Sequence, residues 1–360
     1  MKILELIPSL QSAGAEKFVV ELSNELSHSK DVEINIATLY SKRDGDLLAS
    51  LVKPNIPVFF LNKGDGFSIK CMFKMLSFLR TNRYDVVHVH LSAIPYILLP
   101  AIFLRNIKFC ATIHSEAKRE ADGLITTLIR KFLFKNRLCQ PVTISEESNK
   151  SFVSFYHLQA PIIYNGIRRI EKIEQKDPFI DDRKRGATIL IHIARTHKIK
   201  NQIVLYKCIN RLAEEGYNLV LYHFGRFYDQ EVAKQLMAEK SDRIKIPGEI
   251  LDVESVLRFS DAMCLSSLME GMPMTIIEAF SVGCPVICTP VGGCVNMVKD
   301  GVNGFLSANT SEESYYQALK QFMDLKDKDA LSAGAYDSFE IYDIKKSAKM
   351  YYELFKSRNK

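Results

Sequence analysis

The sequence has little glycine and proline and no long run of apolar residues. With 17 Gly and 12 Pro in 360 residues, the chain has the composition of neither a fibrous nor a disordered protein. Apolar runs such as 97–104 contain Pro100 and end at Arg105, well short of the roughly 20 residues that a membrane-spanning helix needs. The first residues, MKILELIPSL, enter a strand-like run without the features of a secretory signal. We therefore expect a cytoplasmic protein with no membrane span.

The eight cysteines form no CxxC pair. Several lie in strand-like runs (KFCATI, AMCLSS, PVICTP), where a free cysteine behaves as a small buried apolar residue, so we expect reduced thiols. Cys284, Cys288 and Cys294 are irregularly spaced and have no histidine nearby, which argues against a metal site. His88 and His90 point the same way from a strand, but two histidines without a third ligand more often line a cleft than hold zinc. We predict no metal and no cofactor.

The net charge is only +6, but basic residues are concentrated in one stretch. Residues 101–140 contain eight Lys or Arg and three acidic residues. Within it, segment 118–137 combines Arg130, Lys131, Lys135 and Arg137 with six apolar residues: Leu124, Ile125, Leu128, Ile129, Phe132 and Leu133. Either this segment rests on an anionic membrane surface, on the inner face of the cell membrane, or its apolar side belongs to the protein core. We do not expect nucleic-acid binding, because aromatic residues do not interleave with the basic ones.

Apolar strands alternate with amphipathic helices in both halves of the chain. The first half opens with KILELIP followed by a helical pattern, and the second half opens with TILIHIAR followed by another. This alternation predicts parallel sheets covered by helices on both faces. The segment RRIEKIEQKDPFIDDRKR interrupts the pattern and is typical of a solvated loop between domains. We predict an α/β protein divided into an N-terminal domain (1–167), a linker (168–186), a C-terminal domain (187–338) and a final helical segment (339–360) that packs back on the N-terminal domain.

The most informative stretch is 266–293, SSLMEGMPMTIIEAFSVGCPVICTPVGG. Pro273 suits the first turn of a helix and Gly283 suits its end. Glu270 is therefore expected in the loop before this helix and Glu278 inside the helix. The spacing leaves two interpretations of Glu278 open, a ligand-binding carboxylate or an ordinary solvated glutamate.

The second half contains two features that are suited to bind phosphate. Amides at the start of the 274–282 helix, around Met274 and Thr275, are free to bind phosphate or sugar oxygens. Arg195 follows a strand and Lys200 precedes a helix in IHIARTHKIKNQ. At the carboxyl edge of a parallel sheet, these two cations suit a diphosphate, although plain surface charge is an equal alternative.

Together these motifs resemble family 4 glycosyltransferases of the GT-B fold, in which two doubly wound Rossmann-like domains face each other across a cleft. The resemblance rests on EGMPMTIIE, with Glu270 and Glu278 separated by seven residues, and on AFSVGCPVI and VGG after it. Further matches are SAGAE at 12–16, TIH at 112–114, NGI at 165–167, and AR with KNQ. Along the chain these motifs occur in the order that the family has, and they extend over most of its length.

The resemblance implies a retaining, metal-independent, hexosyltransferase-like enzyme. It would move a sugar from a nucleotide-diphosphate sugar, with UDP preferred to GDP, to a hydroxyl of a glycan or lipid-linked acceptor in cell-surface polysaccharide or glycolipid synthesis. Arg195 and Lys200 would hold the diphosphate and stabilise its charge as it leaves. Glu270 would lie beside the donor sugar, and Glu278 would accept hydrogen bonds from the ribose.

The implied site also draws on the first half, where the Gly14 loop and His114 would face the transferred sugar. The catalytic set is His114, Glu270, Arg195 and Lys200. The donor-binding set is Gly14, Arg195, Lys200, Glu270, Gly271, Met272, Met274, Thr275 and Glu278, with Ile246 and Gly248 beside the nucleobase.

The chain departs from the family pattern at two points. AGAE has one glycine where the family often has two, and Asn296 stands where a glutamate is common, so position 296 is left out of the site. A nucleotide-sugar epimerase of the same fold and a catalytically silent sugar- or polyanion-binding homologue remain alternatives. A nicotinamide dehydrogenase is disfavoured because neither half opens with GxGxxG.

Overall fold

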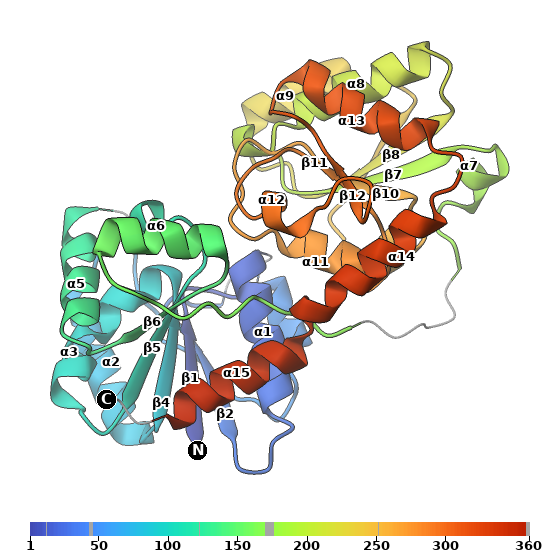
Figure 1. The fold of residues 1–360 in the computed structure, drawn as a ribbon. Coiled ribbons are helices and arrows are strands. Elements are labelled where there is room, and N and C mark those ends of the chain that lie inside the picture. Colours follow the sequence, from blue (N-terminus) through green and yellow to red (C-terminus); the bar gives the residue numbers. More distant parts are fainter. Residues whose placement is uncertain (12, 43–45, 122, 170–175, 251, 358–360) are drawn as a thin grey trace. The chain divides into compact units, whose positions relative to one another are not determined.

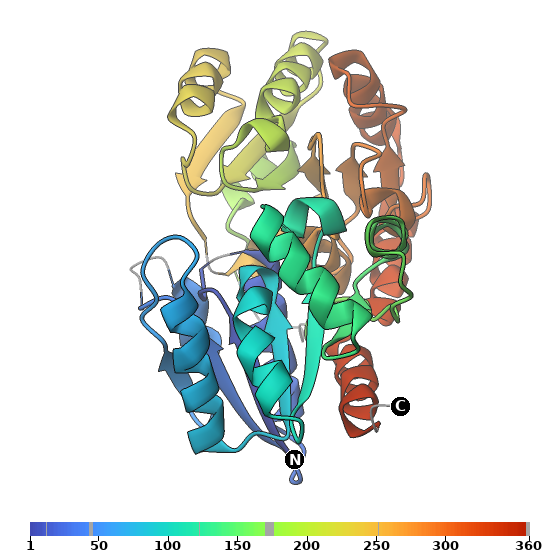
Figure 2. The ribbon, with the colours of Figure 1, turned by 90° about the vertical axis from the view of Figure 1, so that its left-hand side faces the viewer.

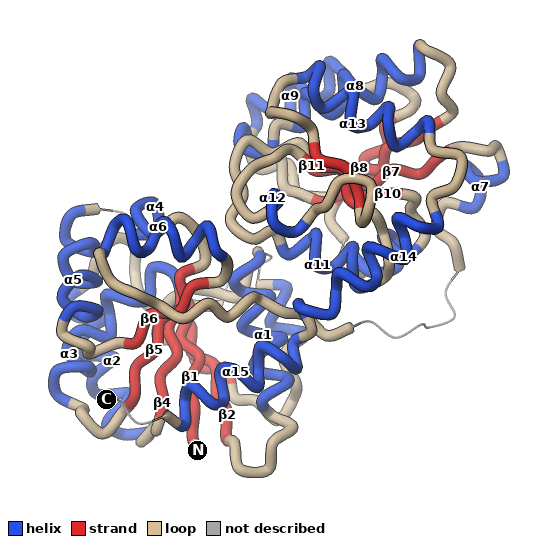
Figure 3. Tube along the Cα trace, viewed as in Figure 1, coloured by secondary structure: helices blue, strands red, loops and turns tan. Residues whose placement is uncertain are grey.

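The chain forms two units, each built on one parallel six-stranded sheet (Figure 1). The computed structural model describes residues 1–11, 13–42, 46–121, 123–169, 176–250 and 252–357. Unit 1 comprises Met1–Arg168 and Tyr342–Lys360, and unit 2 comprises Arg169–Ile341. Within each unit, helices lie on both faces of the sheet (Figures 2 and 3). The predicted fold class, two doubly wound parallel α/β sheets, is confirmed.

The sheet of unit 1 has the order β3-β2-β1-β4-β5-β6, with every pair parallel. Its strands are β1 (Lys2–Ile7), β2 (Glu33–Thr38), β3 (Val58–Phe60), β4 (Val86–His90), β5 (Lys108–Ile113) and β6 (Gln140–Thr143). The central strands are buried on both faces, as their continuous apolar runs require. The apolar character of these strands is interrupted by a row of buried polar residues on the face covered by helices α1 and α15 (Ile344–Lys356), which is described below.

Unit 1 contains α1 (Gly14–Leu26), α2 (Ile69–Asn82), α3 (Leu98–Phe103), α4 (Ala117–Ala121), α5 (Leu124–Lys135), α6 (Glu146–Tyr156) and α15, with 3₁₀ helices η1 (Leu47–Leu51) and η2 (Leu91–Ile97). The sequence pattern missed α6, which begins at a capping box of Ser145 and Ser148. The helical segment after β4 is divided into η2 and α3. The last helix, α15, packs beside α1, where the Tyr351 and Phe18 rings lie 5.9 Å apart.

The sheet of unit 2 has the order β12-β11-β10-β7-β8-β9. Its strands are β7 (Thr188–Ile193), β8 (Leu219–Phe224), β9 (Ile244–Gly248), β10 (Ala262–Leu265), β11 (Val286–Cys288) and β12 (Gly304–Leu306). Its helices are α7 (Ile180–Lys184), α8 (Gln202–Glu214), α9 (Gln230–Glu239), α10 (Val253–Arg258), α11 (Met274–Ser281), α12 (Cys294–Met297), α13 (Glu312–Asp324) and α14 (Asp329–Ser338), with 3₁₀ helices η3 (Lys198–Lys200) and η4 (Phe339–Tyr342), which ends in unit 1.

Part of the predicted linker is folded onto unit 2. Phe179 and Asp182 are buried at the start of α7 and within it. The Asp182 carboxylate accepts hydrogen bonds from Lys245 Nζ and Tyr222 Oη, both 2.5 Å away. The interpretation of this segment as a plain solvated loop is therefore wrong for 179–184, whereas residues 170–175 lie outside the described part.

All eight cysteines are buried free thiols, in agreement with the expected reduced state. Burial raises the pKa of Cys110, Cys208 and Cys284 to about 12. These three thiols therefore stay protonated and serve as core residues. Among the described residues, no helix is both long enough and apolar enough to cross a membrane.

Candidate functional site

In unit 2, the loops that follow β7 and β10 meet at the point where the strand order reverses. The chain leaves β7 towards β8, whereas β10 continues towards β11 on the opposite side. In open parallel sheets, ligands bind beside the carboxyl ends of the strands at such a point. The predicted Arg195 and Lys200 lie after β7, and Glu270 and Gly271 lie after β10.

Lys200 and Glu270 form an ion pair between these two loops. Lys200 Nζ lies 2.7 Å from Glu270 Oε1. Ser267 Oγ donates to the same carboxylate oxygen at 2.5 Å. The loops are also joined through their backbones, because the Leu268 amide donates to the Ile199 carbonyl at 2.7 Å. The structure thus brings together two predicted catalytic residues that are 70 positions apart in the sequence.

Arg195 follows β7 and contacts Tyr228. Its guanidinium stacks on the ring of Tyr228, with 5.0 Å from the guanidinium carbon to the ring centroid. Its carbonyl accepts a hydrogen bond from Gln202 Nε2 at 2.9 Å, which fixes its backbone. The Arg195 side chain is exposed, so its cation is available to a ligand. Tyr228 was not predicted, since no motif marks it.

The loop before α11 leads into a helix start whose first amides have no acceptor among the carbonyls of the helix itself. Pro273 caps α11 without a side-chain hydrogen bond, and the amide of Ile276 bonds back to the Pro273 carbonyl. The amides of Met274 and Thr275 belong to the first turn and have no acceptor within the helix. Such amides favour anions.

Two glycines of the VGG motif, Gly292 and Gly293, pack closely against the backbone of this loop. The Gly293 amide donates to the Gly271 carbonyl at 2.7 Å. A Cβ on Gly292, whose φ is +50°, would lie 1.8 Å from the Glu270 carbonyl oxygen. Only glycine allows this approach. The VGG motif pointed to these residues, but they were left out of the predicted site.

Glu278 is buried in α11 with 5% of its surface exposed. The interpretation as an ordinary solvated glutamate is therefore wrong. Met272 and Met274 are also buried. Ile246 and Gly248 lie in the edge strand β9, where the Gly248 carbonyl accepts from the Gly225 amide at 2.9 Å.

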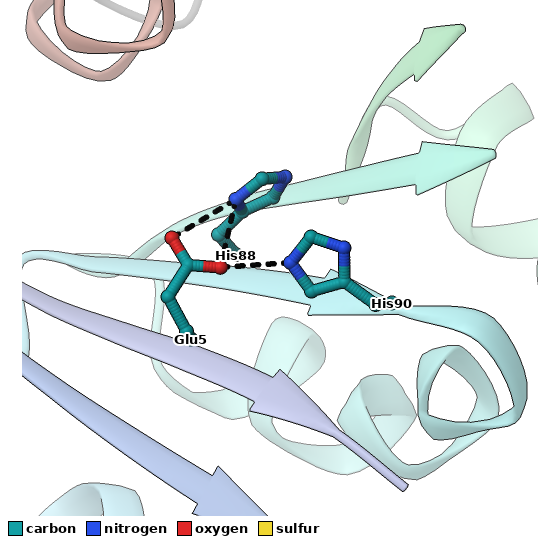
Figure 4. A group of neighbouring side chains, drawn as sticks. All are labelled: Glu5, His88 and His90. Atoms are coloured by element: carbon teal, nitrogen blue, oxygen red, sulfur yellow. Dashed lines mark hydrogen bonds and ion pairs between the residues drawn. The ribbon is translucent and has the colours of Figure 1, made fainter. Parts of the chain in front are cut away.

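In unit 1, a buried polar cluster surrounds Glu5 (Figure 4). Glu5 of β1 is hydrogen-bonded to His90 Nε2 at 2.7 Å and to His88 Nδ1 at 3.1 Å. His90 Nδ1 lies 2.9 Å from His114 Nε2, and His88 Nε2 lies 2.7 Å from Thr112 Oγ1. Glu5, His88 and His90 are completely inaccessible to solvent. The predicted His114 is therefore the end of a network rather than an isolated side chain.

Burial sets the charges of this cluster. It lowers the pKa of His88, His90 and His114 to about 3, so these rings are neutral near pH 7. It also raises the pKa of Glu5, while the hydrogen bond from His90 opposes that rise. Glu5, His88 and His90 each offer one atom that could bind a metal ion, and these three atoms all lie within 4.8 Å of one another. Sequence reasoning missed Glu5 as their partner because 83 positions separate it from His88.

The backbone of the His114 loop is held by a buried ion pair. Glu120 Oε2 accepts from the amides of His114, at 2.7 Å, and Ser115, at 3.2 Å. Its other oxygen accepts from Arg130 Nη1 at 3.2 Å, and Arg130 Nη2 donates to the Leu91 carbonyl at 2.7 Å. Arg130 is 1% exposed. The expectation that Arg130 takes part in a membrane-facing surface is therefore wrong.

Gly14 is the first residue of α1, directly after the β1 loop. One turn later in this helix, the Phe18 ring packs edge-on against His114, with 6.0 Å between centroids. The start of α1 and His114 are therefore neighbours within unit 1.

Helix α5 divides its apolar residues between core and surface. Leu133 and Phe134 are buried, whereas an exposed apolar stripe consists of Leu124, Ile125, Leu128 and Phe132. Lys131, Lys135 and Arg137 beside it are exposed. The interpretation as a core helix therefore holds for the side of α5 that carries Leu133 and Phe134, and docking on a membrane stays a prediction for the exposed stripe.

Comparisons with known proteins point in one direction. The family model described as Glycosyltransferase Family 4 matches residues 12–169, and that of Glycosyl transferases group 1 matches residues 173–336. The chain is 23% identical to the UDP-Gal:alpha-D-GlcNAc-diphosphoundecaprenol alpha-1,3-galactosyltransferase of Escherichia coli, over 91% of this chain and 87% of the relative. It is 22% identical to the capsular polysaccharide biosynthesis glycosyltransferase CapH of Staphylococcus aureus, over 81% of this chain and 82% of the relative. The crystal structure of Anabaena Alr3699/HepE in complex with UDP superposes with a TM-score of 0.81 at 19% identity, covering 99% of this chain and 100% of that one.

Proposed function

The chain belongs to the group 1, or family 4, glycosyltransferases of the GT-B fold, and we propose that it transfers a sugar with retention from a UDP-sugar to a hydroxyl of a lipid-linked glycan. The observation that carries this proposal is the Lys200–Glu270 pair beside the start of α11. It joins a cation, a carboxylate and free amides at one sheet edge. That combination suits a sugar diphosphate.

The residues of unit 2 supply the charge stabilisation that the reaction needs. As the bond between the anomeric carbon and the β-phosphate oxygen breaks, its electron pair stays on the departing UDP. Lys200, Arg195 and the first amides of α11 stabilise this charge. The acceptor oxygen bonds to the same face of the sugar, and its proton passes to a phosphate oxygen. Glu270 orients Lys200 and lies beside the sugar, and Glu278 accepts hydrogen bonds from the ribose.

The nucleotide and the acceptor are inferred from relatives. The Escherichia coli relative uses UDP-Gal and acts on a sugar carried by diphosphoundecaprenol. A relative from Campylobacter jejuni, 23% identical over 85% of this chain and 84% of its own length, also acts on a glycan linked to undecaprenol diphosphate. The Anabaena protein was crystallised with UDP-glucose. These names support UDP over GDP and a polyprenyl-linked acceptor in cell-surface polysaccharide synthesis.

A lipid-linked acceptor is located at a membrane, and the exposed apolar stripe of α5 suits the surface of one. Four large apolar side chains next to Lys131, Lys135 and Arg137 have the chemistry of an interfacial helix on anionic lipid. We infer that α5 brings unit 1 to the membrane, where the acceptor is located.

A thermal-shift titration tests the donor site first. UDP, GDP and ADP would be added with and without EDTA to the wild type, to Arg195→Ala and to Lys326→Ala, a change of an exposed cation elsewhere in unit 2. At a hundred times its Kd, a nucleotide stabilises by about 2.7 kcal/mol. We expect UDP to stabilise the wild type and Lys326→Ala with or without EDTA, and Arg195→Ala less. If none of the nucleotides stabilises the wild type, a silent homologue becomes the better description.

Release of UDP in the presence of acceptor then separates transfer from binding. The anomeric configuration of the product, read by NMR, tests retention. An inverted product would contradict the proposed stereochemistry, and interconversion of UDP-sugars without acceptor would favour an epimerase.

A further inference from the structure

One ring nitrogen of His114 has no partner. Its Nε2 bonds to His90, but its Nδ1 is buried and makes no hydrogen bond within the described residues. A buried polar atom without a partner destabilises the folded state. Such atoms are rare in native proteins and call for a ligand or an ordered water. His114 lies at the carboxyl end of β5 beside the start of α1, where a ligand of unit 1 is expected.

The hydrogen bonds behind His114 determine where its proton lies. The Glu5 carboxylate is only an acceptor, so the proton in its 2.7 Å bond to His90 is on His90 Nε2. A neutral imidazole has one N–H, which leaves a lone pair on His90 Nδ1. The proton in the 2.9 Å bond between His90 and His114 is therefore on His114 Nε2. It follows that His114 Nδ1 carries a lone pair.

The charge states on which this deduction depends have a physical cause. Burial lowers the pKa of His90 and His114 to about 3, so neither ring carries a second proton near neutral pH. Two ring N–H groups donate to the Glu5 carboxylate, one from His90 and one from His88. Burial raises the pKa of Glu5, and the hydrogen bond from His90 opposes that rise and favours the ionised form.

We propose that Glu5 and His90 are positioning residues that hold His114 in the Nε2–H tautomer, so that its Nδ1 accepts a hydrogen bond from a substrate hydroxyl. This inference rests on the proposed function, because it requires a substrate at His114. It also specifies the recognised chemistry. A lone pair accepts from a sugar hydroxyl and repels a phosphate or carbonyl oxygen.

A second branch of the same network leads away from His114 and provides the control. His88 Nε2 accepts from Thr112 Oγ1, which in turn lies 2.7 Å from Tyr351 Oη of α15. Tyr351→Phe removes the end of this branch and leaves the path from Glu5 through His90 intact. Glu5→Gln keeps the shape of the side chain but gives one ring an N–H donor instead of an acceptor. His90→Phe removes the acceptor of the His114 proton.

Nitrogen NMR of protein labelled with ¹⁵N-histidine measures the tautomer directly. The chain has eight histidines, and His114→Gln identifies the two signals of His114 by their loss. In the wild type and in Tyr351→Phe, we expect a protonated Nε2 and an unprotonated Nδ1. In Glu5→Gln and His90→Phe, we expect the two signals to move towards their average. We also expect kcat to fall by about tenfold in these two variants, the value of roughly one hydrogen bond, while stabilisation by UDP stays unchanged.

The wild-type tautomer is read without substrate and without turnover, so it separates this inference from the proposed function. A proton on His114 Nδ1 in the wild type overturns the inference. An unchanged tautomer or an unchanged kcat in Glu5→Gln and His90→Phe also overturns it, as does a stoichiometric metal ion bound at Glu5, His88 and His90 in elemental analysis. If the predicted tautomers are observed but no UDP-sugar is turned over, the positioning by Glu5 and His90 stands and the proposed function fails.

Discussion

Lys200 Nζ lies 2.7 Å from Glu270 Oε1, and this ion pair joins the loops that follow β7 and β10, two neighbouring strands. The Glu270 side chain is 9% exposed and that of Lys200 is 26% exposed, so both charges are partly shielded from water. The lysine is held in position before any substrate arrives. A cation that needs no reordering during the reaction stabilises a leaving diphosphate more effectively than a mobile one.

Replacing Lys200 tests the role of this cation. We expect Lys200→Ala to lower kcat by about 10²-fold, in the range seen when one preorganised donor to a developing negative charge is removed. Lys198→Ala is the matched control, because Lys198 belongs to the same 3₁₀ turn and is exposed. UDP release would be measured with the UDP-sugar found active in screening. Equal losses in the two variants would show that Lys200 has no special role.

Gly292 tests whether the Glu270 loop depends on its support. Gly292→Ala places a methyl group 1.8 Å from the Glu270 carbonyl oxygen at a φ of +50°. Gly301→Ala has the same backbone strain at a φ of +69°, but open space around it. We expect the left-handed backbone to lower the free energy of unfolding of each variant by about 1 kcal/mol. Only Gly292→Ala should also lose stabilisation by UDP. The thermal shift with UDP measures this difference, and an unaffected Gly292→Ala would contradict it.

The strands and most helices could be predicted because their signals are local. β1 and β7 are mostly apolar, and Pro273 and Gly283 mark the two ends of α11. The short helix α7 escaped prediction because it consists mostly of charged residues and the buried aromatic residue Phe179 only precedes it. The helix α6 escaped because its start is a capping box of two serines rather than an apolar pattern.

Only those site residues that belong to a sequence motif could be predicted. Lys200 and Glu270 each belong to a motif, and the sheet order brings them together. Glu5 gave no signal, because an acidic residue in a strand such as KILELI indicates nothing until β4 supplies His88 and His90 beside it. Arg130 was assigned to the surface because its partner, Glu120, lies on another helix. Pairings of this kind depend on tertiary contacts.

Acid should destabilise the protein through its buried histidines. Burial lowers the pKa of His223 from 6.5 to about 4, so the folded ring is neutral while the unfolded ring is protonated below pH 6.5. The unfolded state therefore binds more protons between those values, and stability falls as the pH falls. One such residue lowers the free energy of unfolding by up to about 3 kcal/mol as the pH falls through this range.

Urea unfolding between about pH 4.5 and about pH 7.5 measures this dependence. We expect His223→Gln to make the loss of stability with acid shallower. His157→Asn should leave the slope unchanged, because His157 is exposed and asparagine tolerates its φ of 56°. A His223→Gln slope equal to that of the wild type would be inconsistent with a buried neutral ring.

The ion pair between Arg130 and Glu120 should contribute to stability through its burial. Arg130→Met leaves the Glu120 carboxylate buried and uncompensated, which costs about 3–5 kcal/mol. Lys131→Met, at the next and exposed position, should change the free energy of unfolding by less than about 0.5 kcal/mol. Urea denaturation of both variants, and of Arg130→Met combined with Glu120→Gln, measures the coupling. A double variant that is no more stable than Arg130→Met would mean that the stranded charge is not the cause.

Membrane association should depend on both chemistries of α5. Apolar side chains supply burial in the headgroup region, and the cations supply attraction to anionic lipid, each worth about 1 kcal/mol near the surface. We expect flotation with anionic liposomes and little with neutral ones. Leu128→Ser with Phe132→Ser should abolish flotation, and so should serine at Lys131, Lys135 and Arg137.

The control places serine at three exposed lysines of unit 2, Lys234, Lys240 and Lys326. It changes the net charge equally and should preserve flotation. If both triple variants lose binding alike, net charge rather than the surface of α5 drives the association. If the wild type does not float, α5 does not dock on the membrane.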